Sequence, residues 1–457
     1  MGMTVKESTI VCPAEDTPRH TLWLSKLDMI SRMPYSHTRV AYIYSPINED
    51  NNNKCTKFFD TQTLKTSLSK VLVPFYPVAG RLKHNDLDNR IEIDCNALGA
   101  LFEEVETTHT LDDFEGYKNP NNEFRKLVMP ICDYSRGISS FPLVMARVTR
   151  FKCGGACIGL ATHHHIADGI GHTFFFNSWA RLARGLKLEV HPSHDRAMVL
   201  SPRDPFQVKF QHLEYEPPLP TIRYRSEMAV PMESTFKLTK DQIDTLKLQA
   251  IQAQAKAVPS YKYTTYEVLA GHVWRSTCKA RGLGVGDREQ CTKLYIPTDG
   301  RSRLKDVDLP QGYFGNLTFF TACVAQACEI TEKPLWYAAS KVHEALNKVK
   351  EVEYLRSAID YLESQSDVIN LVRGAHSTAS PNLSINSWGK MPINEADFGW
   401  GSPKVVGHGG IRNEGQSFLV HSLEGDGTVS LQINLLACHM PLFKDHFYDL
   451  VGNFLVT

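Results

Sequence analysis

The fold is decided by one stretch of the sequence, Ala156-Cys157-Ile158-Gly159-Leu160-Ala161-Thr162-His163-His164-His165-Ile166-Ala167-Asp168-Gly169. Its first six residues are apolar or small, which predicts a strand that is buried on both faces. Three histidines follow, and then a helical run from about Thr173 to Arg184 that Gly185 is well placed to end. Reactive groups are often held on a loop of this kind, between a strand and a helix.

Outward from this stretch, strands and helices are mixed without strict alternation. Helices are predicted by apolar periodicity and by capping boxes, and strands by alternation and by the turn Glu424-Gly425-Asp426-Gly427. The predicted helices are 58–76, one that opens at Thr239, one that opens at Thr264, and 334–350; the predicted strands include 90–94, 141–148 and the hairpin 418–435. This mixture predicts the α/β class, with two domains that each contain a mixed sheet.

The segment 186–225 differs from the rest of the chain. It carries six prolines and little periodicity, which is typical of an extended connection between domains. We therefore predict an N-terminal domain at 1–185, a crossover linker at 186–225 and a C-terminal domain at 226–457. A length of 457 residues agrees with more than one domain.

The composition excludes several classes of protein. Lys plus Arg equals Asp plus Glu, and no basic run suggests a nucleic-acid partner. No apolar stretch approaches the roughly 18–20 residues of a membrane span, and the N-terminus does not resemble a signal peptide. We expect a cytoplasmic protein with no nucleic-acid or membrane partner. The cysteines are not at Cys-x-x-Cys spacing, and no second pair completes a zinc site.

His164 is the sharpest chemical feature, and its motif alone leaves several interpretations open. An imidazole has an unperturbed pKa near 6.5, so it can take a proton at neutral pH. The three histidines could also be ordinary loop residues, or His164, Asp168 and His172 could form a metal site at helical steps of four. A Ser-His-Asp hydrolase is less well supported, because the sequence has no Gly-x-Ser-x-Gly elbow.

A second motif, Asp397-Phe398-Gly399-Trp400-Gly401, narrows these interpretations. Together, His-x-x-x-Asp-Gly and Asp-Phe-Gly-Trp-Gly, about 230 residues apart, resemble the two signatures of the BAHD acyltransferases, a plant family that uses acyl-CoA donors. The resemblance covers almost the whole chain. It is similar to the hydroxycinnamoyl-CoA branch in stretches such as Tyr313-Phe314-Gly315-Asn316, and to anthranilate N-acyltransferases in Leu24-Ser25-Lys26-Leu27-Asp28-Met29-Ile30.

The resemblance implies a chloramphenicol acetyltransferase-like fold of two similar-sized domains, with the active-site channel at their interface. His164 would then be the general base, and the indole N–H of Trp388 is a candidate donor to the oxyanion. Asp168 would pair with Arg301 and hold the loop. The remaining motif residues, Gly169, Asp397, Gly399 and Gly401, would be structural. No metal and no permanently bound cofactor are implied, because the acyl-CoA thioester is a co-substrate that is already activated.

The same resemblance suggests substrate contacts. Arg373 matches a residue that grips the acceptor carboxylate, a role that suits the planar fork of a guanidinium. Asn386, His37 and Tyr42 are further candidates on the acceptor side, and Thr265 and Tyr266 on the coenzyme A side. Asn386 and Val40 depart from the shikimate enzymes, so the acceptor stays open between shikimate, quinate, another hydroxy acid and an amine.

The resulting prediction is a monomeric acyltransferase that moves a hydroxycinnamoyl group, p-coumaroyl or caffeoyl, from coenzyme A to the hydroxyl of an acidic acceptor. The alternative is an N-acyltransferase that forms an amide with an aromatic amine such as anthranilate, from hydroxycinnamoyl- or benzoyl-CoA. Two hypotheses of other classes remain to be tested. One is a thioesterase that uses water as the acceptor, and the other is a catalytically silent relative that acts as a binding or scaffold protein.

Overall fold

The computed structural model describes residues 2–30, 35–45, 58–88, 90–117, 122–222, 229–254, 262–366, 371 and 374–450. The chain divides into two compact units of similar size. Unit 1 consists of Met1–Ser201, Val307–Leu317 and Met391–Gly410, and unit 2 of Pro202–Asp306, Thr318–Lys390 and Ile411–Thr457. These units are discontinuous in sequence, whereas the domain limits 1–185, 186–225 and 226–457 are continuous stretches and stay a prediction.

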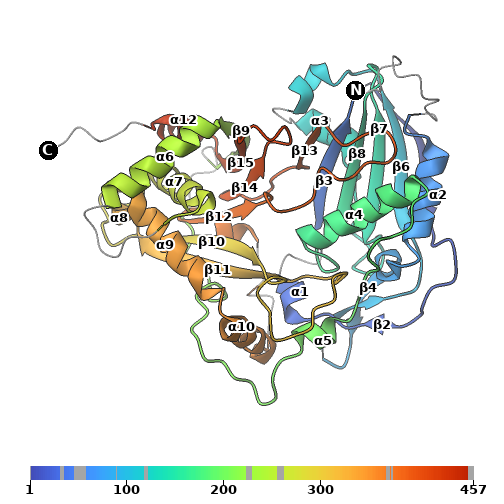
Figure 1. Cartoon of the computed structure of the whole chain (residues 1–457), viewed down its shortest axis with the longest axis horizontal. Coiled ribbons are helices and arrows are strands. Elements are labelled where there is room, and N and C mark those ends of the chain that lie inside the picture. Colours follow the sequence, from blue (N-terminus) through green and yellow to red (C-terminus); the bar gives the residue numbers. More distant parts are fainter. Residues whose placement is uncertain are drawn as a thin grey trace. The chain divides into compact units, whose positions relative to one another are not determined.

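Unit 1 is built on a mixed six-stranded sheet. Its strands β6 and β7 are parallel, and its other neighbours are antiparallel. Helices α2 (Thr61–Val71) and α4 (Gly169–Ala183) pack together beside this sheet, and α3 (Asn122–Val128) contacts β7 and β8 (Figure 1). The strands lie in the order β1 (Met3–Val11), β6 (Ala100–Thr107), β7 (Val144–Arg150), β8 (Ala156–His163), β3 (His37–Tyr44) and β13 (Val405–His408).

Unit 1 also contains a small second sheet and several helices. A second sheet has the strand order β2 (Thr21–Leu22), β5 (Arg90–Asp94), β4 (Arg81–Asn85). The helices are α1 (Lys26–Ile30), α2 (Thr61–Val71), η1 (Tyr76–Ala79), η2 (Asp112–Tyr117), α3 (Asn122–Val128), α4 (Gly169–Ala183) and α5 (Arg196–Leu200). The predicted helix 58–76 is therefore too long: Asp60 caps its start, and the regular α-helix ends before Pro74.

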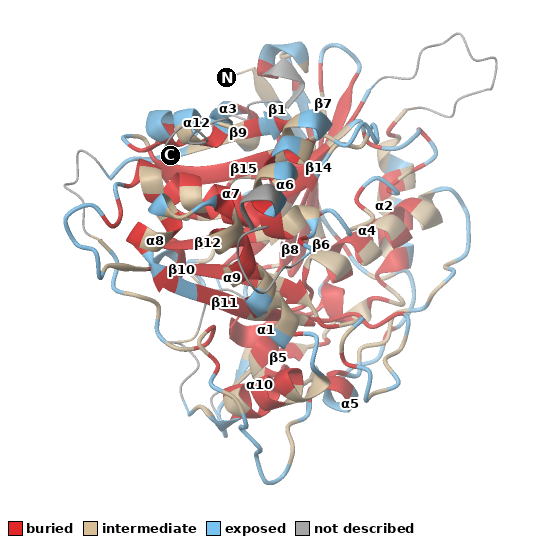
Figure 2. Ribbon diagram, turned by 60° about the vertical axis from the view of Figure 1, so that its left-hand side comes forward, coloured by how far each residue is buried: buried red, intermediate tan, exposed pale blue. Residues whose placement is uncertain are grey.

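The strand that precedes the histidines is confirmed and extends to His163, with all eight of its residues buried. Figure 2 shows β8 in the buried colour. Gly159 is required in this strand, because a Cβ there would lie 1.8 Å from the carbonyl oxygen of Val128, the last residue of α3. Helix α4 starts at Gly169, earlier than the predicted Thr173, since the Asp168 side chain caps it by accepting from the N–H of Gly171.

Unit 2 contains the other mixed six-stranded sheet, in which β12 is parallel to both of its neighbours. The strand order is β11 (Thr318–Gln326), β10 (Cys291–Asp299), β12 (Asn382–Ser387), β14 (Gln416–His421), β15 (Val429–Leu436) and β9 (Pro231–Leu238). Its helices are α6 (Lys240–Gln254), α7 (Thr265–Ala280), α8 (Ala327–Glu332), α9 (Leu335–Lys348), α10 (Val352–Ser364), α11 (Ala375–Thr378) and α12 (Met440–Tyr448).

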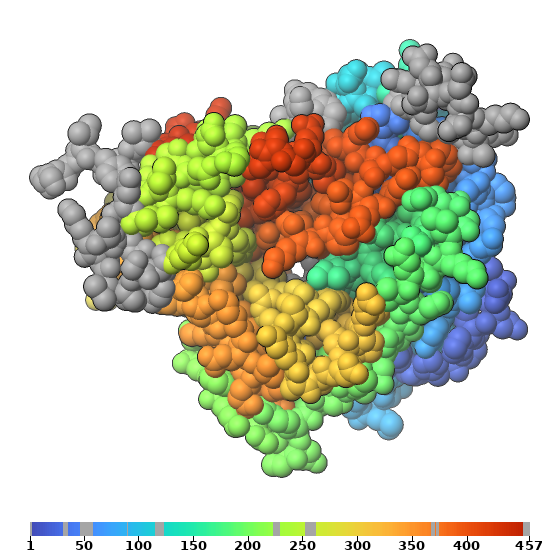
Figure 3. Space-filling view, viewed as in Figure 1, coloured from blue at the N-terminus to red at the C-terminus, as the bar shows by residue number. Residues whose placement is uncertain are grey.

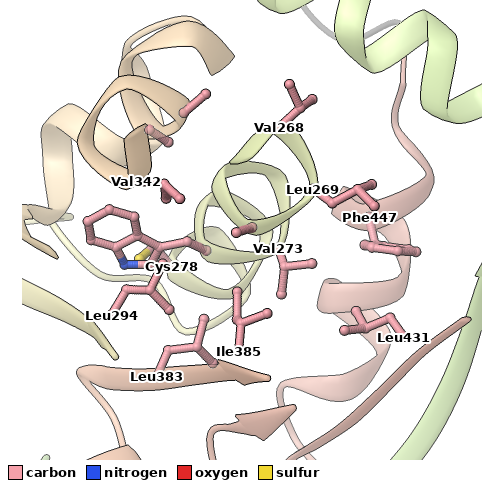
Figure 4. Packing of buried hydrophobic residues seen from close by; sticks show 14 of the residues in the cluster. Val268, Leu269, Val273, Cys278, Leu294, Val342, Leu383, Ile385, Leu431 and Phe447 are labelled. Carbon is pink, nitrogen blue, oxygen red and sulfur yellow. The ribbon is translucent and has the colours of Figure 1, made fainter. Parts of the chain in front are cut away.

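Helix α7 lies at the centre of the unit 2 core. Its Val268, Leu269 and Val273 pack with Val342 of α9 and Phe447 of α12 (Figure 4). Both predicted capping boxes are present, at Thr239 before α6 and at Thr264 before α7. The predicted hairpin is also confirmed as the antiparallel pair β14 and β15. Two units with mixed sheets and flanking helices confirm the predicted α/β class.

Candidate active site

The three histidines lie where β8 turns into α4. His163 and His165 are buried, with their rings edge to face at a centroid separation of 4.8 Å, and the ring of His163 also lies 5.0 Å from that of His37. His164, between them, is only half-buried. The fold therefore places two imidazoles in the core of unit 1 and leaves the middle one partly accessible, as a base that must reach a substrate requires.

The segment Asn316-Leu317 holds both ends of the histidine loop, which we define as residues 164–168. The amide Nδ2 of Asn316 donates to the carbonyl oxygen of His164 at 2.8 Å. At the other end, the N–H of Leu317 donates to Oδ2 of Asp168 at 2.9 Å, while Oδ1 of Asp168 accepts from Gly171. The Asp168 carboxylate thus connects the loop to helix α4 and to the segment 307–317.

A buried carboxylate, Asp28, joins the groups that hold the loop. Its Oδ1 accepts from Nδ2 of Asn316 at 2.9 Å, and its Oδ2 accepts from the hydroxyl of Ser25 at 2.8 Å. Nε of Arg196 lies 3.6 Å from Oδ1 of Asp28, and Nη2 of Arg196 donates to the carbonyl oxygen of Ile166 at 2.8 Å. The side chains of Asp28 and Arg196 are 0% and 1% exposed, so water could not take the place of either partner if the other were removed.

Sequence reasoning missed Asp28, Asn316 and Arg196 as site residues. Asp28 and Asn316 both lie in stretches that resemble the BAHD acyltransferases, and this resemblance is the signal that could have pointed to them. Nothing in the sequence pattern indicates Arg196, which lies in the proline-rich segment 186–225 and resembles an ordinary charged residue there.

A second imidazole near His164 does not compete with it for protons. Burial, followed by the nearby His164, lowers the pKa of His172 to about 3, so His172 is neutral at pH 7. Its ring nitrogens contact the hydroxyls of Thr162 at 2.9 Å and Tyr42 at 3.2 Å. Burial also raises the pKa of the Tyr42 hydroxyl. A metal site of His164, Asp168 and His172 would need all three residues on one helical face. Because α4 begins only at Gly169, His164 is not part of that helix.

His37 is buried as well. Its Nδ1 lies 2.7 Å from the hydroxyl of Tyr134, and its Nε2 lies 2.9 Å from the carbonyl oxygen of Pro142. These contacts fix the ring within unit 1 beside His163. The substrate contacts suggested for His37 and Tyr42 stay predictions, and the structure gives both side chains partners inside the protein.

The second motif forms a turn on unit 1. Oδ1 of Asp397 accepts from the N–H groups of Gly399 and Gly401, at 2.7 and 2.9 Å, and both glycines have a positive φ. The Phe398 ring packs against Trp179 of α4 at 5.1 Å, and Figure 3 shows the orange segment around residue 400 beside the green α4. This geometry supports the structural role proposed for the motif.

The other candidates belong to unit 2. The Tyr266 hydroxyl donates to the carbonyl oxygen of Ile385 at 2.9 Å, which brings the start of α7, with Thr265, to the strand that carries Asn386. The Asn386 amide donates to Ser417 O at 3.1 Å. Trp388 is buried, with its ring 5.4 Å from that of Phe418.

Two predictions about charged residues stay untested. Arg301 is paired with Asp299 at 3.0 Å, and the predicted pair of Arg301 with Asp168 would join the two units, so it stays a prediction. Arg373 lies outside the described residues.

A Ser-His-acid chain does occur in unit 2, whereas the motif histidines belong to unit 1. Nε2 of His212 lies 3.0 Å from Oγ of Ser357, and its Nδ1 lies 2.9 Å from Oε1 of Glu214. All three side chains are buried, and the Ser357 hydroxyl also accepts from the N–H of Lys209 at 2.9 Å. These three hydrogen-bonded side chains therefore attach the segment 209–214 to α10, and they present no accessible nucleophile.

Replacing Ser357 tests this assignment. We expect Ser357→Ala to leave acyl transfer unchanged and to lower the free energy of unfolding by about 1–3 kcal/mol, because buried polar groups lose their partner. Urea unfolding and steady-state rates measure the two effects. Ser364→Ala, at an exposed position of the same helix, is the control and should stay within about 0.5 kcal/mol. Loss of activity in a folded Ser357→Ala protein would favour hydrolase chemistry at this site instead.

Among the residues that the structure describes, no group of three or more His, Cys, Asp or Glu could hold a metal ion. Within those ranges, no helix has both the length and the apolar character that a membrane crossing requires.

Comparison with known proteins defines the class. Residues 1–450 match the model of the Transferase family, so the chain is a transferase. It belongs to the BAHD acyltransferases, and two relatives of full length support this. Shikimate O-hydroxycinnamoyltransferase of Nicotiana tabacum is 49% identical, and anthranilate N-benzoyltransferase protein 3 of Dianthus caryophyllus is 47% identical; each match covers 98% of this chain and 100% of the relative.

A solved structure shares the fold at low identity. The chain is similar to TRI101 of F. sporotrichioides, solved with coenzyme A and T-2, at a TM-score of 0.72 and 17% identity, with 93% of this chain and 97% of that one covered. This likeness confirms the predicted fold class, and the family model with the two relatives confirms the predicted family and the acyltransferase activity.

Proposed function

We propose that this acyltransferase moves a hydroxycinnamoyl group from coenzyme A to a hydroxyl of an acidic acceptor, with His164 as the general base. The observation that carries the proposal is the half-buried imidazole of His164, on a loop held by buried side chains, next to a neutral His172. Such a site offers one partly accessible proton acceptor on an anchored backbone.

The reaction needs no protein nucleophile. His164 takes the proton of the acceptor hydroxyl while the oxygen attacks the thioester carbonyl. The tetrahedral oxyanion then collapses, the carbon–sulfur bond breaks, and the coenzyme A thiolate leaves and receives a proton. General base catalysis of this kind contributes roughly 10²–10⁴-fold. The Trp388 indole N–H is our candidate donor to the oxyanion, a role whose loss is costly in other acyl transfers.

The substrate contacts are assigned by resemblance. Arg373 is proposed to bind the acceptor carboxylate, with Asn386, His37 and Tyr42 on the same side. Thr265 and Tyr266 are proposed to contact the acyl-CoA. The relative from Nicotiana tabacum, a shikimate O-hydroxycinnamoyltransferase, supports a hydroxycinnamoyl donor and shikimate as the acceptor, with quinate as a similar hydroxy acid. Cytoplasmic location and a monomeric state complete the proposal.

A second candidate is N-acylation of an aromatic amine such as anthranilate. It is favoured by Asn386, where the shikimate enzymes have Thr, and by the 47% identity to the enzyme from Dianthus caryophyllus. The chemistry of the base is unchanged, because His164 would remove a proton from the attacking nitrogen instead of an oxygen.

The deciding experiment supplies p-coumaroyl-CoA with shikimate, quinate, malate, anthranilate or spermidine and identifies the products. Ester formation with a hydroxy acid supports the main proposal, and an amide supports the second candidate. Free acid released without an acceptor would indicate a thioesterase, and no turnover with any pair would indicate a silent relative.

Arg373→Ala sharpens this test. We expect KM for an acidic acceptor to rise about 10-fold to 100-fold, because a charged hydrogen bond contributes about 1.5–3 kcal/mol, while KM for the thioester stays unchanged. Arg288→Ala, at an exposed arginine paired with Glu332 in the same unit, is the matched control. Equal kinetics in both variants would remove Arg373 from the acceptor site.

A further inference from the structure

We propose that Asn316 is a positioning residue for the general base, because it holds the backbone of His164 itself. The proposal rests on the function proposed above. Nδ2 of Asn316 donates to the His164 carbonyl at 2.8 Å and to Oδ1 of Asp28 at 2.9 Å. A carbonyl and a carboxylate can only accept, so the amide nitrogen must face them, and both of its N–H groups are used.

The Asn316 amide is itself held in place. Its residue is completely buried, and its backbone N–H also donates to Asp28, at 3.2 Å. Asp28 is in turn fixed by the N–H and hydroxyl of Ser25 and lies beside the Arg196 guanidinium. The His164 carbonyl is therefore tied to a water-excluded network whose members come from three distant parts of the sequence.

This anchor acts on catalysis through geometry. The His164 side chain leaves the Cα atom adjacent to that carbonyl, so a shift of the carbonyl reorients the imidazole. A misplacement of about 1 Å at a reacting group costs about 100-fold in rate. Arg196 and Leu317 hold other residues of the loop, Ile166 and Asp168, whereas Asn316 bonds to the residue that carries the base.

A positioning role predicts a specific kinetic pattern. The substrates would still bind in Asn316→Ala, since Asn316 contacts neither of them in this proposal. The transition state would lose the aligned base. We therefore expect kcat to fall about 10-fold to 100-fold, with both KM values unchanged. A residue that only supports the fold would lower the folded fraction and leave kcat per folded molecule as it was.

The experiment compares wild type, Asn316→Ala, Asn316→Ser, Asn177→Ala and His164→Ala, each assayed well below its unfolding midpoint and normalised to folded protein. Asn177→Ala is the control, because its amide also donates to a loop carbonyl of unit 1, that of Pro392, at 2.9 Å. Asn316→Ser covers the case in which the alanine variant does not fold: one hydroxyl proton cannot serve two acceptors, so the same fall in kcat is expected.

Three outcomes would count against the proposal, and they differ. If His164→Ala abolishes transfer while both Asn316 variants keep the wild-type kcat, Asn316 is only structural and the proposed function stands. If the wild type transfers no acyl group, or His164→Ala keeps its kcat, the proposed function fails and the positioning role fails with it. A fall in kcat of the same size in Asn177→Ala would also count against a specific effect.

Discussion

His164→Ala is expected to lower kcat by about 10²–10⁴-fold, the contribution of a well-placed general base. The acceptor would still approach the thioester, but no side chain would take its proton. The buried His172 cannot substitute, because its pKa of about 3 makes it a very weak base and its nitrogens already contact Thr162 and Tyr42. Product formation from p-coumaroyl-CoA and the preferred acceptor measures the loss.

The variant should remain folded. His164 is only half-buried, and its anchor to Asn316 uses the backbone carbonyl, which alanine keeps. We expect an unfolding midpoint close to that of the wild type, so the loss is chemical. A kcat within a few-fold of the wild-type value would refute the general-base assignment and favour the interpretation that the three histidines are ordinary loop residues.

Asp28→Ala is expected to give the largest loss of stability, about 3–5 kcal/mol, the cost of leaving a buried charge without its partner. Arg196, 1% exposed, would lose the carboxylate 3.6 Å from its Nε, and the amide of Asn316 would lose an acceptor. Urea unfolding of wild type and variant gives the difference in the free energy of unfolding.

The contrast with an exposed pair makes this measurement specific. Asp244 also accepts from a cation, Lys240 at 2.8 Å, but the two side chains are 46% and 68% exposed. We expect Asp244→Ala to cost about 0.5 kcal/mol or less, as exposed helix pairs do. If the two aspartate variants were equally stable, the network around Asp28 would contribute little, and water would have to reach it.

Much of the fold could be predicted because the relevant information is local. The burial of β8 follows from its apolar run, and α6 and α7 begin where capping boxes occur in the sequence. The predicted ends of helices were less accurate than the helices themselves. Helix α4 starts four residues before the predicted Thr173, because Gly169 and Gly171 resemble loop residues until Asp168 is seen to cap them.

Long-range pairings could not be predicted. Nothing in Val405–His408 indicates β3 as its partner. Two antiparallel strands that are so far apart in the chain share no sequence pattern that would reveal their pairing. The same holds for the site. His164 and Asp168 stand in one motif, but Asp28 reads as an ordinary polar residue, and its burial depends on Asn316 and Arg196, which only folding brings to it.

The late return of the chain to unit 1 has a consequence for synthesis. Strand β13 covers the edge of β3, and residues up to 408 must leave the ribosome before that edge is paired. Nascent domains generally fold in order from the N-terminus, and an uncovered strand edge invites pairing with other chains. The N-terminal half should therefore depend on chaperones until most of unit 2 has been translated. Expressed alone, it would lack both its last strand and the amide that holds His164.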